Sequence, residues 1–562
     1  MSKKLSYAIV VAAGTVLMSC NSKMNQFKAD YFNVNPNPLE VVGRKVPATV
    51  TANVPPKFFV KNAEVTVTPT LVYEGGSATS VPYTFQGEKV RGNNPVVSYS
   101  NGGTMTIPVS YDYVPEMIKS DLVLNFEVVQ GGKKYVLPAV TVANGVVATA
   151  ALTDVATINP ASAQDKFQRI INEKYSADIR FLINRANIRE SELKTPEMQA
   201  FNQDLLSANR DSSRVIDEIN ISSYASPDGS LEFNTKLAEE RETTTQAYLK
   251  NKLKKDNITE FGELTAQFTP EDWEGFQRLV AASDIQDKDL IISVLSMYKD
   301  PEQREIEIRN IANVFDQVAD QILPQLRYSR LTASVNVIGR SDEQLNKQFD
   351  TDPSKLSVDE LLYTATLTNN NDRKKAIYEA CIRQYPDDYR AYNNLGRIQF
   401  QEKDFTAAEA NFARATRLNP NAPEMKMNEG VIALLKNDYN TANQKFGNAG
   451  GVKELDEALG TYYLLQGDNN AAARAFGDVK SNNAAVAQIL TKDYSKAQST
   501  LSGISEPDAT TYYLKAVLGA RTNNESAVTT NLRQAIKLDD SLAKLAMNDI
   551  EFSKFNLASV LN

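Results

Sequence analysis

The stretch DDYRAYNNLGRIQFQEKDFTAAEANFARATRLNP (387–420) decides the fold of the last third of the chain. Its key positions are Tyr392, Leu395, Gly396, Ala408, Phe412, Ala415 and Pro420. Small Gly396 and Ala408 allow two helices to approach closely, and the ring of Phe412 fills space beside them. The stretch therefore predicts a packed helix pair.

The same positions recur further along the chain. A shift of 34 residues gives Gly430, Ala442, Phe446 and Ala449, and a slightly shorter step gives Gly460, Ala472 and Phe476. Weaker copies lie near Ala376, Ala497 and Val528. This pattern resembles the tetratricopeptide repeat, a 34-residue helix pair. The resemblance implies an all-α superhelix over residues 356–562.

A helix pair of this kind cannot bury its apolar face alone, so the pairs stack and leave a concave groove. Such grooves hold an extended or helical segment of another protein. The positions expected to line the groove are Asn393, Arg397, Met427, Val431, Glu457 and Thr461. The alternative for each position is that its side chain only packs in the core or faces solvent. The side chains that bind a C-terminal carboxylate in some grooves of this type are not evident here, so the sequence does not specify the ligand of the groove.

Strand and helix patterns alternate over residues 165–345. Strands are expected at Asp178–Ile188 and Val215–Ser223, and helices at Thr195–Ala208 and Glu232–Lys254. Between them, the turn Ser226-Pro227-Asp228-Gly229 points at the N-terminus of the second helix, a natural anion site. The side chains of Asn234 and Arg241 share one face of this helix.

This segment resembles the OmpA-like, peptidoglycan-associated domain, whose helix reads Asn-x-x-Leu-Ser-x-x-Arg. Asn234, Leu237 and Arg241 match, while Ala238 replaces the serine. In the family, a loop aspartate and the helix arginine bind the diaminopimelate of the cell wall. The resemblance transfers the arginine to Arg241, whereas Ser226 stands at the aspartate position and Asp228 is a substitute. A long helical insertion, 273–325, precedes the last strand. Two alternatives are a fold retained for protein docking and an Arg241 that merely pairs with nearby glutamates.

Residues 46–160 have a period of two, as in Val65-Thr66-Val67-Thr68, with turns at Gly75-Gly76 and Gly131-Gly132. Short strands at this spacing predict a β-sandwich of immunoglobulin-like type. Residues 20–45 are polar and contain Asn35-Pro36-Asn37-Pro38, so they are expected to form a tether.

Residues 1–19 have the pattern of a secretory signal: Lys3 and Lys4, then an apolar run too short to span a bilayer. The ending Leu17-Met18-Ser19-Cys20 resembles the lipobox of bacterial lipoproteins, which implies lipidation (palmitate among the acyl chains) of Cys20. The alternative is an ordinary signal with a chance cysteine. The acidic run that follows the cysteine in surface-exported lipoproteins of the Bacteroidota is missing. We therefore expect the periplasmic face of the outer membrane.

Composition excludes several functions. The net charge of −8 argues against a nucleic-acid partner and against attraction to anionic lipid headgroups. Because the chain contains no histidine, catalytic triads and His-ligated metals are excluded, and no metal or cofactor is expected. The second cysteine, Cys381, is expected to be a small buried residue.

The sequence thus predicts a multidomain, outer-membrane-anchored lipoprotein of Bacteroidota type that acts as a protein-binding scaffold in the envelope. The complex that it supports would serve secretion, outer-membrane protein assembly or surface-structure assembly. A simple tether between peptidoglycan and the outer membrane is the alternative. A carboxylate-dependent enzyme remains third, although the sequence marks no carboxylate pair.

Overall fold

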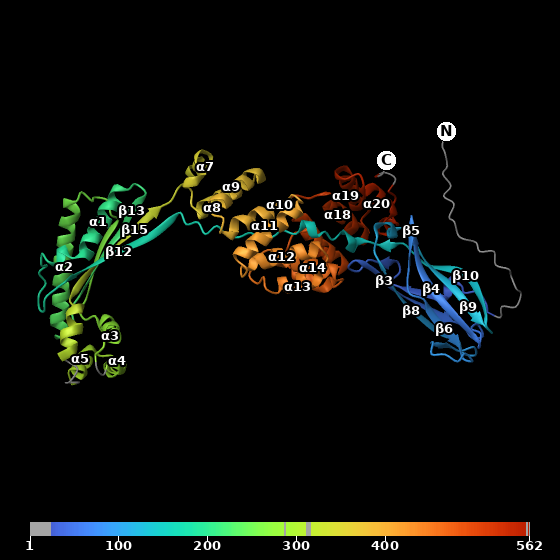
Figure 1. The fold of residues 1–562 in the computed structure, drawn as a ribbon, viewed down its shortest axis with the longest axis horizontal. Helices are drawn as coiled ribbons and strands as arrows, with labels where there is room; N and C mark the ends of the chain where they lie inside the picture. The colour runs from blue at the N-terminus through green and yellow to red at the C-terminus, as the bar shows by residue number, and fades with distance from the viewer. Residues whose placement is uncertain (1–23, 286–287, 311–315, 558–559, 561–562) are drawn as a thin grey trace. The chain divides into compact units, whose positions relative to one another are not determined.

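The computed structural model describes residues 24–285, 288–310, 316–557 and 560. The predicted signal peptide and Cys20 lie outside the described residues. The chain divides into two compact units (Figure 1). The first unit joins the residues up to Gln164 to those from Asn370 onward, and the second comprises Asp165–Asn369.

The N-terminal part of the first unit consists of two sheets around one apolar core. One sheet has the order β1 (Phe32–Asn35), β3 (Lys45–Val54), β8 (Gly103–Asp112). The other has the order β10 (Lys133–Asn144), β9 (Ser120–Gln130), β4 (Ala63–Tyr73), β6 (Tyr83–Gly87), β7 (Val96–Val97), with β5 (Gly76–Thr79) paired to β4. A short parallel pair joins β2 (Leu39–Glu40) to β11 (Val146–Val147).

The period of two in the sequence is the reason for this packing. Alternate residues of a strand point to opposite faces of the sheet. In β3 and β8 the buried set is Val46, Ala48, Val50, Ala52, Val54, Met105, Ile107, Val109 and Tyr111; β4 and β9 contribute Val65, Val67, Leu71, Leu122, Leu124, Phe126 and Val128. The sheet-rich fold expected for residues 46–160 is confirmed, except that residues after Val147 leave the sheets.

The expected tether at 20–45 requires correction, because its described part belongs to the sheet-rich fold. Met24 and Phe27 are each 4% exposed. The ring of Phe27 stacks on Phe126 at 4.5 Å and meets Phe58 at 4.9 Å. β1 then pairs along β3. Two isolated apolar residues among polar neighbours gave no periodic signal, yet they complete the core.

In the second unit, one four-stranded sheet has the order β12 (Ile170–Arg180), β15 (Tyr328–Ile338), β13 (Arg214–Tyr224), β14 (Glu263–Thr269). Its helices are α1 (Pro196–Arg210), α2 (Leu231–Lys255), α3 (Trp273–Ala282), α4 (Lys288–Met297), α5 (Pro301–Asn310), α7 (Asp342–Thr351) and α8 (Val358–Thr366). Apolar residues of α1 and α2 pack on one face of the sheet. The insertion α3–α5 between β14 and β15 has a small core of its own.

Two boundaries of the second unit differ from the sequence prediction. The first strand is Ile170–Arg180 rather than Asp178–Ile188, because β12 pairs along the whole of β15 through a segment that is mostly polar. Helix α8 belongs to this unit and not to the repeats. The ring of Tyr363 stacks on Phe167 at 4.5 Å, and Glu360 accepts a hydrogen bond from Arg340 at 2.7 Å.

The remaining helices form the repeats, beginning with α9 (Asn371–Gln384). The pairs are α10 (Tyr389–Gln401) with α11 (Phe405–Leu418), α12 (Pro423–Leu435) with α13 (Tyr439–Phe446), α14 (Leu455–Leu465) with α15 (Asn469–Phe476), α16 (Asn482–Leu490) with α17 (Tyr494–Ser502), and α18 (Ala509–Arg521) with α19 (Glu525–Leu538), followed by α20 (Leu542–Asn548). The helices within each pair are connected by short turns.

The repeat glycines are explained by contact with the second helix of each pair. A Cβ atom at Gly430 or Gly460 would lie 2.5 Å from the ring of Phe446 or Phe476. At Gly396 it would lie 3.0 Å from Phe412. The predicted close approach of the two helices is therefore confirmed.

The packing of Phe27 gives a first prediction. Phe27→Ala should lower the free energy of unfolding of the first unit by about 3 kcal/mol, since it removes a buried aromatic side chain. Hydrogen exchange in increasing urea, followed by mass spectrometry on peptides of the first unit, measures the change. Asn25→Ala, at an exposed neighbour, is the control. Equal stability of the two variants would show that the segment is a tether.

Candidate functional site

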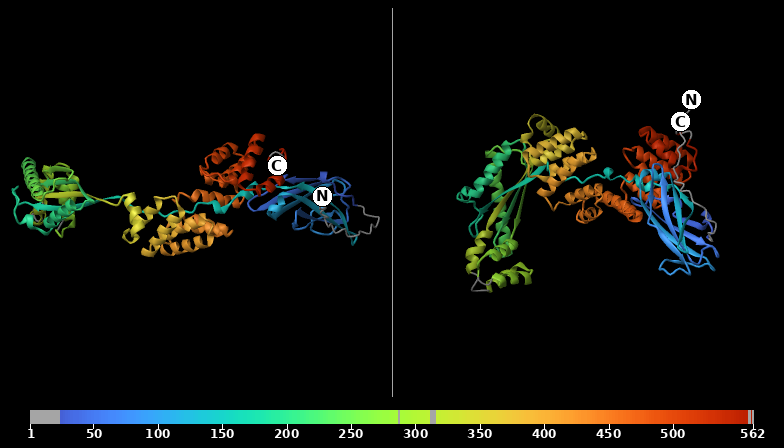
Figure 2. Two further views of the ribbon diagram at one scale, coloured as in Figure 1. Left: turned by 90° about the horizontal axis from the view of Figure 1, so that it is seen from above. Right: turned by 45° about the vertical axis from the view of Figure 1, so that its right-hand side comes forward.

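The concave side of the repeats is occupied by the chain itself. Residues 154–164, the groove segment, follow β11 and the short helix η3 (Thr149–Leu152) and run along the repeat helices (Figures 1 and 2). Successive residues bond to α16, α14, α12 and α10, so the segment runs against the order of the repeats.

Three asparagines hold the backbone of the groove segment. The side-chain oxygen of each accepts the backbone N–H of one residue, and its NH₂ group donates to the carbonyl of the same residue. The pairs are Asn483 with Asp154, Asn428 with Ala161, and Asn394 with Ala163. The six bonds measure 2.7–3.0 Å. A primary amide has one acceptor and one donor edge, so it matches a peptide unit as a neighbouring strand would.

Further donors reach two carbonyls at the middle of the segment, and one of them is the carbonyl of Ala161 that Asn428 also binds. Asn393 donates to the carbonyl of Ala161 at 2.9 Å, and Arg397 donates through Nε to that of Pro160 at 2.9 Å. Leaving a buried backbone group without a partner costs roughly 1–3 kcal/mol. These side chains therefore allow the groove segment, which contains only the short 3-10 helix η4 (Val155–Thr157), to lie in the groove without a sheet.

Apolar side chains of the groove segment complete the contact. Val155 is 5% exposed and Ile158 1%. Both lie in one cluster with Met427 and Val431 of α12, which are fully buried. The groove thus combines a polar grip on the backbone with apolar pockets for particular side chains.

A buried carboxylate lies at the middle of the groove. Oε2 of Glu457 accepts hydrogen bonds from the backbone and the side chain of Asn159, at 3.3 and 3.4 Å. Burial raises the pKa of Glu457, and the two N–H donors of Asn159 act in the opposite direction. Thr461 donates to the backbone carbonyl of Glu457 and accepts from Asn483, which links the backbone of α14 to Asn483.

All six residues predicted to line the groove, Asn393, Arg397, Met427, Val431, Glu457 and Thr461, lie against the groove segment or against a residue that holds it. The occupant differs from the expectation, because it is a segment of the same chain. Asn394, Asn428 and Asn483 were not predicted. The 34-residue spacing of Asn394 and Asn428 is one repeat length and is the signal that could have revealed them.

In the second unit, the residues of the OmpA-like motif converge near the N-terminus of α2. Arg241 is fully buried and donates to the backbone carbonyls of Leu182, Arg185 and Tyr224, at 3.3, 3.0 and 2.8 Å. Burial lowers the pKa of Arg241 to about 10, helped by the nearby charge of Arg327. The guanidinium is thus cationic at neutral pH and holds two chain segments to α2: the loop that contains Leu182 and Arg185, and the end of β13 at Tyr224.

The loop before α2 carries the other members of the motif. Ser226 donates to Asp228 at 2.6 Å, and Arg327 contacts both residues, with Nη2 2.9 Å from Oδ2 of Asp228. Asn234 donates to the carbonyl of Gly229 at 2.9 Å and to Glu271 at 3.2 Å. The four predicted residues are therefore neighbours, and Arg327, which the sequence did not single out, provides a second cation. Peptidoglycan binding by this cluster stays a prediction.

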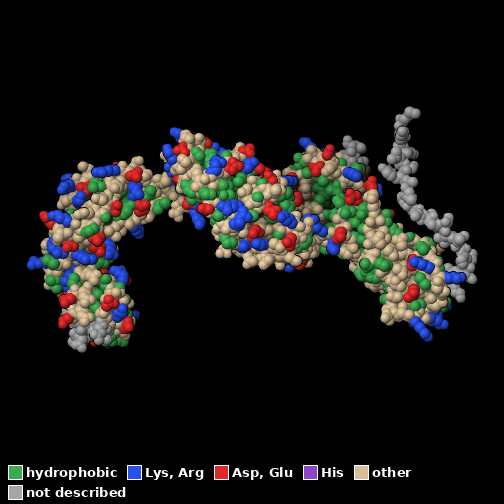
Figure 3. Space-filling model, in the orientation of Figure 1, with side chains coloured by type: hydrophobic (Ala, Val, Ile, Leu, Met, Phe, Trp, Pro, Cys, Tyr) green, Lys and Arg blue, Asp and Glu red, His purple; other side chains and the backbone are tan. Residues whose placement is uncertain are grey.

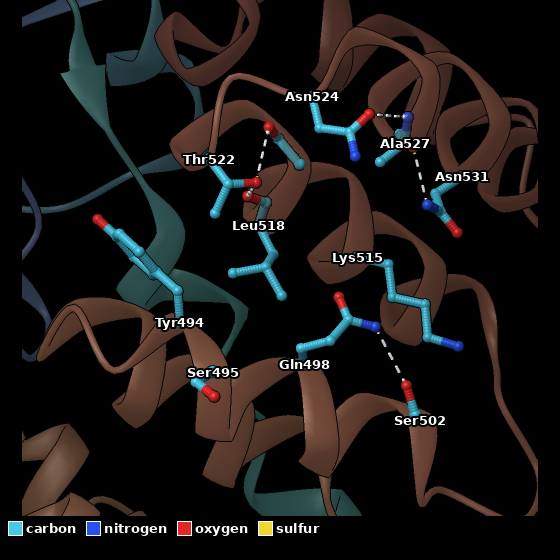
Figure 4. Close-up of a pocket in the computed structure, with 11 residues that line it drawn as sticks. Tyr494, Ser495, Gln498, Ser502, Lys515, Leu518, Thr522, Asn524, Ala527 and Asn531 are labelled. Atoms are coloured by element: carbon cyan, nitrogen blue, oxygen red, sulfur yellow. Dashed lines mark hydrogen bonds between the residues drawn. The ribbon is translucent and has the colours of Figure 1, made fainter.

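A separate hollow of about 440 Å³ lies among α17, α18 and α19 (Figure 4). Its wall includes Gln498, Lys515 and Asn531. Gln498 donates to Ser502 at 3.1 Å, and Asn531 donates to the carbonyl of Ala527 at 2.8 Å. The groove segment is held by other helices, so this hollow is a distinct surface of the last repeats, with both polar and apolar residues in its wall.

The described part of the chain contains neither a cluster of metal ligands nor a membrane-spanning helix. No cluster of three or more acidic or cysteine side chains is arranged to hold a metal ion there. Within the same residues, no helix has the length and apolar character needed to cross a membrane.

Comparison with known proteins identifies the repeats. A family model described as tetratricopeptide repeat matches residues 369–423 and 403–446. No curated protein matches the chain. Similar solved structures include a tetratricopeptide repeat protein from Parabacteroides merdae (12% identity, TM-score 0.29, 37% of this chain and 91% of that one) and pilF of Pseudomonas aeruginosa (14%, 0.28, 37% and 98%). The Cut9 and Hcn1 complex is similar over 57% of this chain and 70% of that one, at 11% identity and a TM-score of 0.31.

The asparagine pairs give a second prediction. Asn428→Ala should destabilise the first unit by about 2 kcal/mol and should increase proteolytic cleavage within 154–164, because the backbone of Ala161 loses two bonds. Limited proteolysis with mass spectrometry locates the cuts. Asn443→Ala, at an exposed position on α13, is the matched control. Unchanged cleavage in Asn428→Ala would contradict this role.

Proposed function

We propose that this protein is a non-catalytic scaffold of the bacterial cell envelope, anchored in the outer membrane by lipid on Cys20 and facing the periplasm. It holds envelope proteins together in a machine for secretion, outer-membrane protein assembly or surface-structure assembly. Tetratricopeptide repeats, which form protein-binding surfaces in general, support the interaction role.

The observation that carries this proposal is the filled groove. Because the groove segment is part of the chain, its effective concentration at the groove is on the order of millimolar, which a free peptide seldom matches. The segment also unites the sheet-rich part and the repeats, which form one compact unit. A partner therefore binds the outer faces of the repeats, such as the hollow at α17–α19, while the groove supports the framework.

The anchor is supported by the sequence before Met24. The Leu-Met-Ser-Cys ending precedes by only four residues the point at which the chain enters the sheet-rich core. No long tether separates the two, so a lipid on Cys20 would hold this fold close to the bilayer.

The scaffold predicts that a tagged protein, purified from gently solubilised outer membranes, recovers a defined set of envelope proteins identified by mass spectrometry. A variant that ends at residue 369 lacks the repeats and should therefore not recover these proteins. Asn428→Ala should still recover them, because the partners bind outside the groove. Cys20→Ala should move the protein out of the membrane fraction. Recovery of the wild-type protein without partners would refute the scaffold.

A second candidate function is attachment to peptidoglycan, favoured by the convergence of Ser226, Asp228, Asn234 and Arg241 at one loop. Asp228 retains 18% side-chain exposure and so is the member best placed to meet a ligand amine. Arg241→Ala is an ambiguous test, since it would remove the hydrogen bonds through which Arg241 holds the backbone carbonyls of Leu182, Arg185 and Tyr224.

If the protein attaches to peptidoglycan, it should sediment with purified peptidoglycan. Asp228→Asn should then weaken this binding about tenfold and leave the circular dichroism spectrum unchanged. One lost charge-assisted hydrogen bond is worth roughly 1.5–3 kcal/mol, which corresponds to about tenfold or more. Glu239→Gln, on the exposed side of α2, is the control. A wild-type protein that stays in the supernatant would exclude the tether and leave the scaffold intact.

A further inference from the structure

One end of the sheet-rich fold gathers cationic side chains, although the whole chain has a net charge of −8. They lie just before β1, in the β3–β4 and β6–β7 loops, and beside the β9–β10 turn. The set, here termed the cationic end, is Lys28, Lys57, Lys61, Lys89, Arg91, Lys133 and Lys134. Blue side chains mark this end of the molecule in Figure 3.

Backbone and side-chain contacts bring these loops together. The N–H of Lys57 donates to the carbonyl of Tyr99 at 2.6 Å, and that of Lys89 donates to the carbonyl of Lys61 at 2.8 Å. Gln130, at the β9–β10 turn, donates to Asn62 at 3.4 Å. Because these positions are fixed by the fold, the charges form one surface.

Acidic residues offset only part of this charge. Glu88 pairs with Lys61 at 3.2 Å, and Glu127 pairs with Lys134 at 2.6 Å. Asp30 and Glu64 are the other carboxylates of these loops and strand ends. Among the described residues, no carboxylate forms an ion pair with Lys28, Lys89 or Arg91, and all three are exposed. Seven cations thus face four anions.

The beginning of the described chain lies at the same end. Met24 is buried in the core, and the ring of Phe27 contacts Phe58, the neighbour of Lys57. Cys20 precedes Met24 by four residues, and a fully extended chain covers at most about 3.5 Å per residue. Four residues therefore allow the Cα atoms of Cys20 and Met24 to be at most about 14 Å apart.

We propose that the cationic end binds the anionic, phosphate-bearing headgroups of the membrane and so fixes the orientation of the anchored protein. This inference rests on the proposed lipid anchor, which brings this end to the bilayer. It reverses the expectation, drawn from the net charge, that anionic lipid is not attracted. A net charge averages the whole chain, whereas a membrane surface meets one face of it.

The strength of binding to the membrane depends on the number of cationic side chains that face it. Each Lys or Arg near an anionic membrane contributes about a fivefold gain in binding, and screening by salt weakens it. Reversal of three charges should therefore weaken binding by about 100-fold or more at low salt.

The test uses the polypeptide from Asn21 onward without lipid, which retains every described residue, and measures cosedimentation with vesicles. We expect binding to vesicles that contain phosphatidylglycerol, none to phosphatidylcholine alone, and release by salt. Lys28→Glu with Lys89→Glu and Arg91→Glu should abolish binding. The control reverses three exposed lysines of the repeat region, Lys453, Lys480 and Lys537, and should bind as the wild type does.

Three results would overturn the proposal: no binding of the wild type to anionic vesicles, equal loss in the control variant, or charge-dependent binding to heparin without binding to vesicles. Thermal unfolding of each variant excludes a folding defect as the cause of lost binding. Because lipid and partners are absent from this assay, its failure leaves the scaffold proposal untouched, and loss of partners in cells leaves this surface untouched.

Discussion

The organisation of this protein depends on one constraint: a chain segment buried in a helical groove must have its backbone groups hydrogen-bonded. No strand lies beside residues 154–164 to provide these bonds. Asn394, Asn428 and Asn483 do so instead, each by accepting from and donating to one residue of the segment. With the backbone satisfied, the apolar side chains of Val155 and Ile158 can be buried at little cost, and the repeats gain a permanent inner surface.

This arrangement changes what the repeats offer to other molecules. An empty concave groove would be a peptide-binding site, whereas a groove filled from within is a structural joint. The outer helices then carry the surfaces available to partners, including the hollow of α17–α19. In the second unit, Arg241 likewise serves the fold, through three backbone carbonyls, while Asp228 and Arg327 lie nearer to solvent.

The charge of one surface of this protein differs in sign from the net charge of the whole chain. The chain is acidic as a whole, yet the end at which its described part begins is cationic. Four loops distant in sequence meet there because the two sheets share one core. Aromatic contacts of Phe27 fix the beginning of the described chain at this end, and the predicted lipidation site precedes Met24 by four residues in the sequence. The proposed lipid on Cys20 and the cationic side chains would then contact the same bilayer, although the sequence alone does not show that they lie at the same end.

The sequence by itself determined what depends on local periodicity: the helix pairs with Gly396 and Phe412, the period-two strands, and the six positions that line the groove. It failed where pairing over a distance decided the outcome. β12 includes polar residues that only β15 holds in the sheet, and Met24 and Phe27 lack any periodic neighbours. The groove segment bonds to residues 226 to 329 positions away, so no local pattern could mark it. Tertiary structure alone decided that the groove is filled, because a peptide backbone carries its hydrogen-bonding groups whatever its sequence.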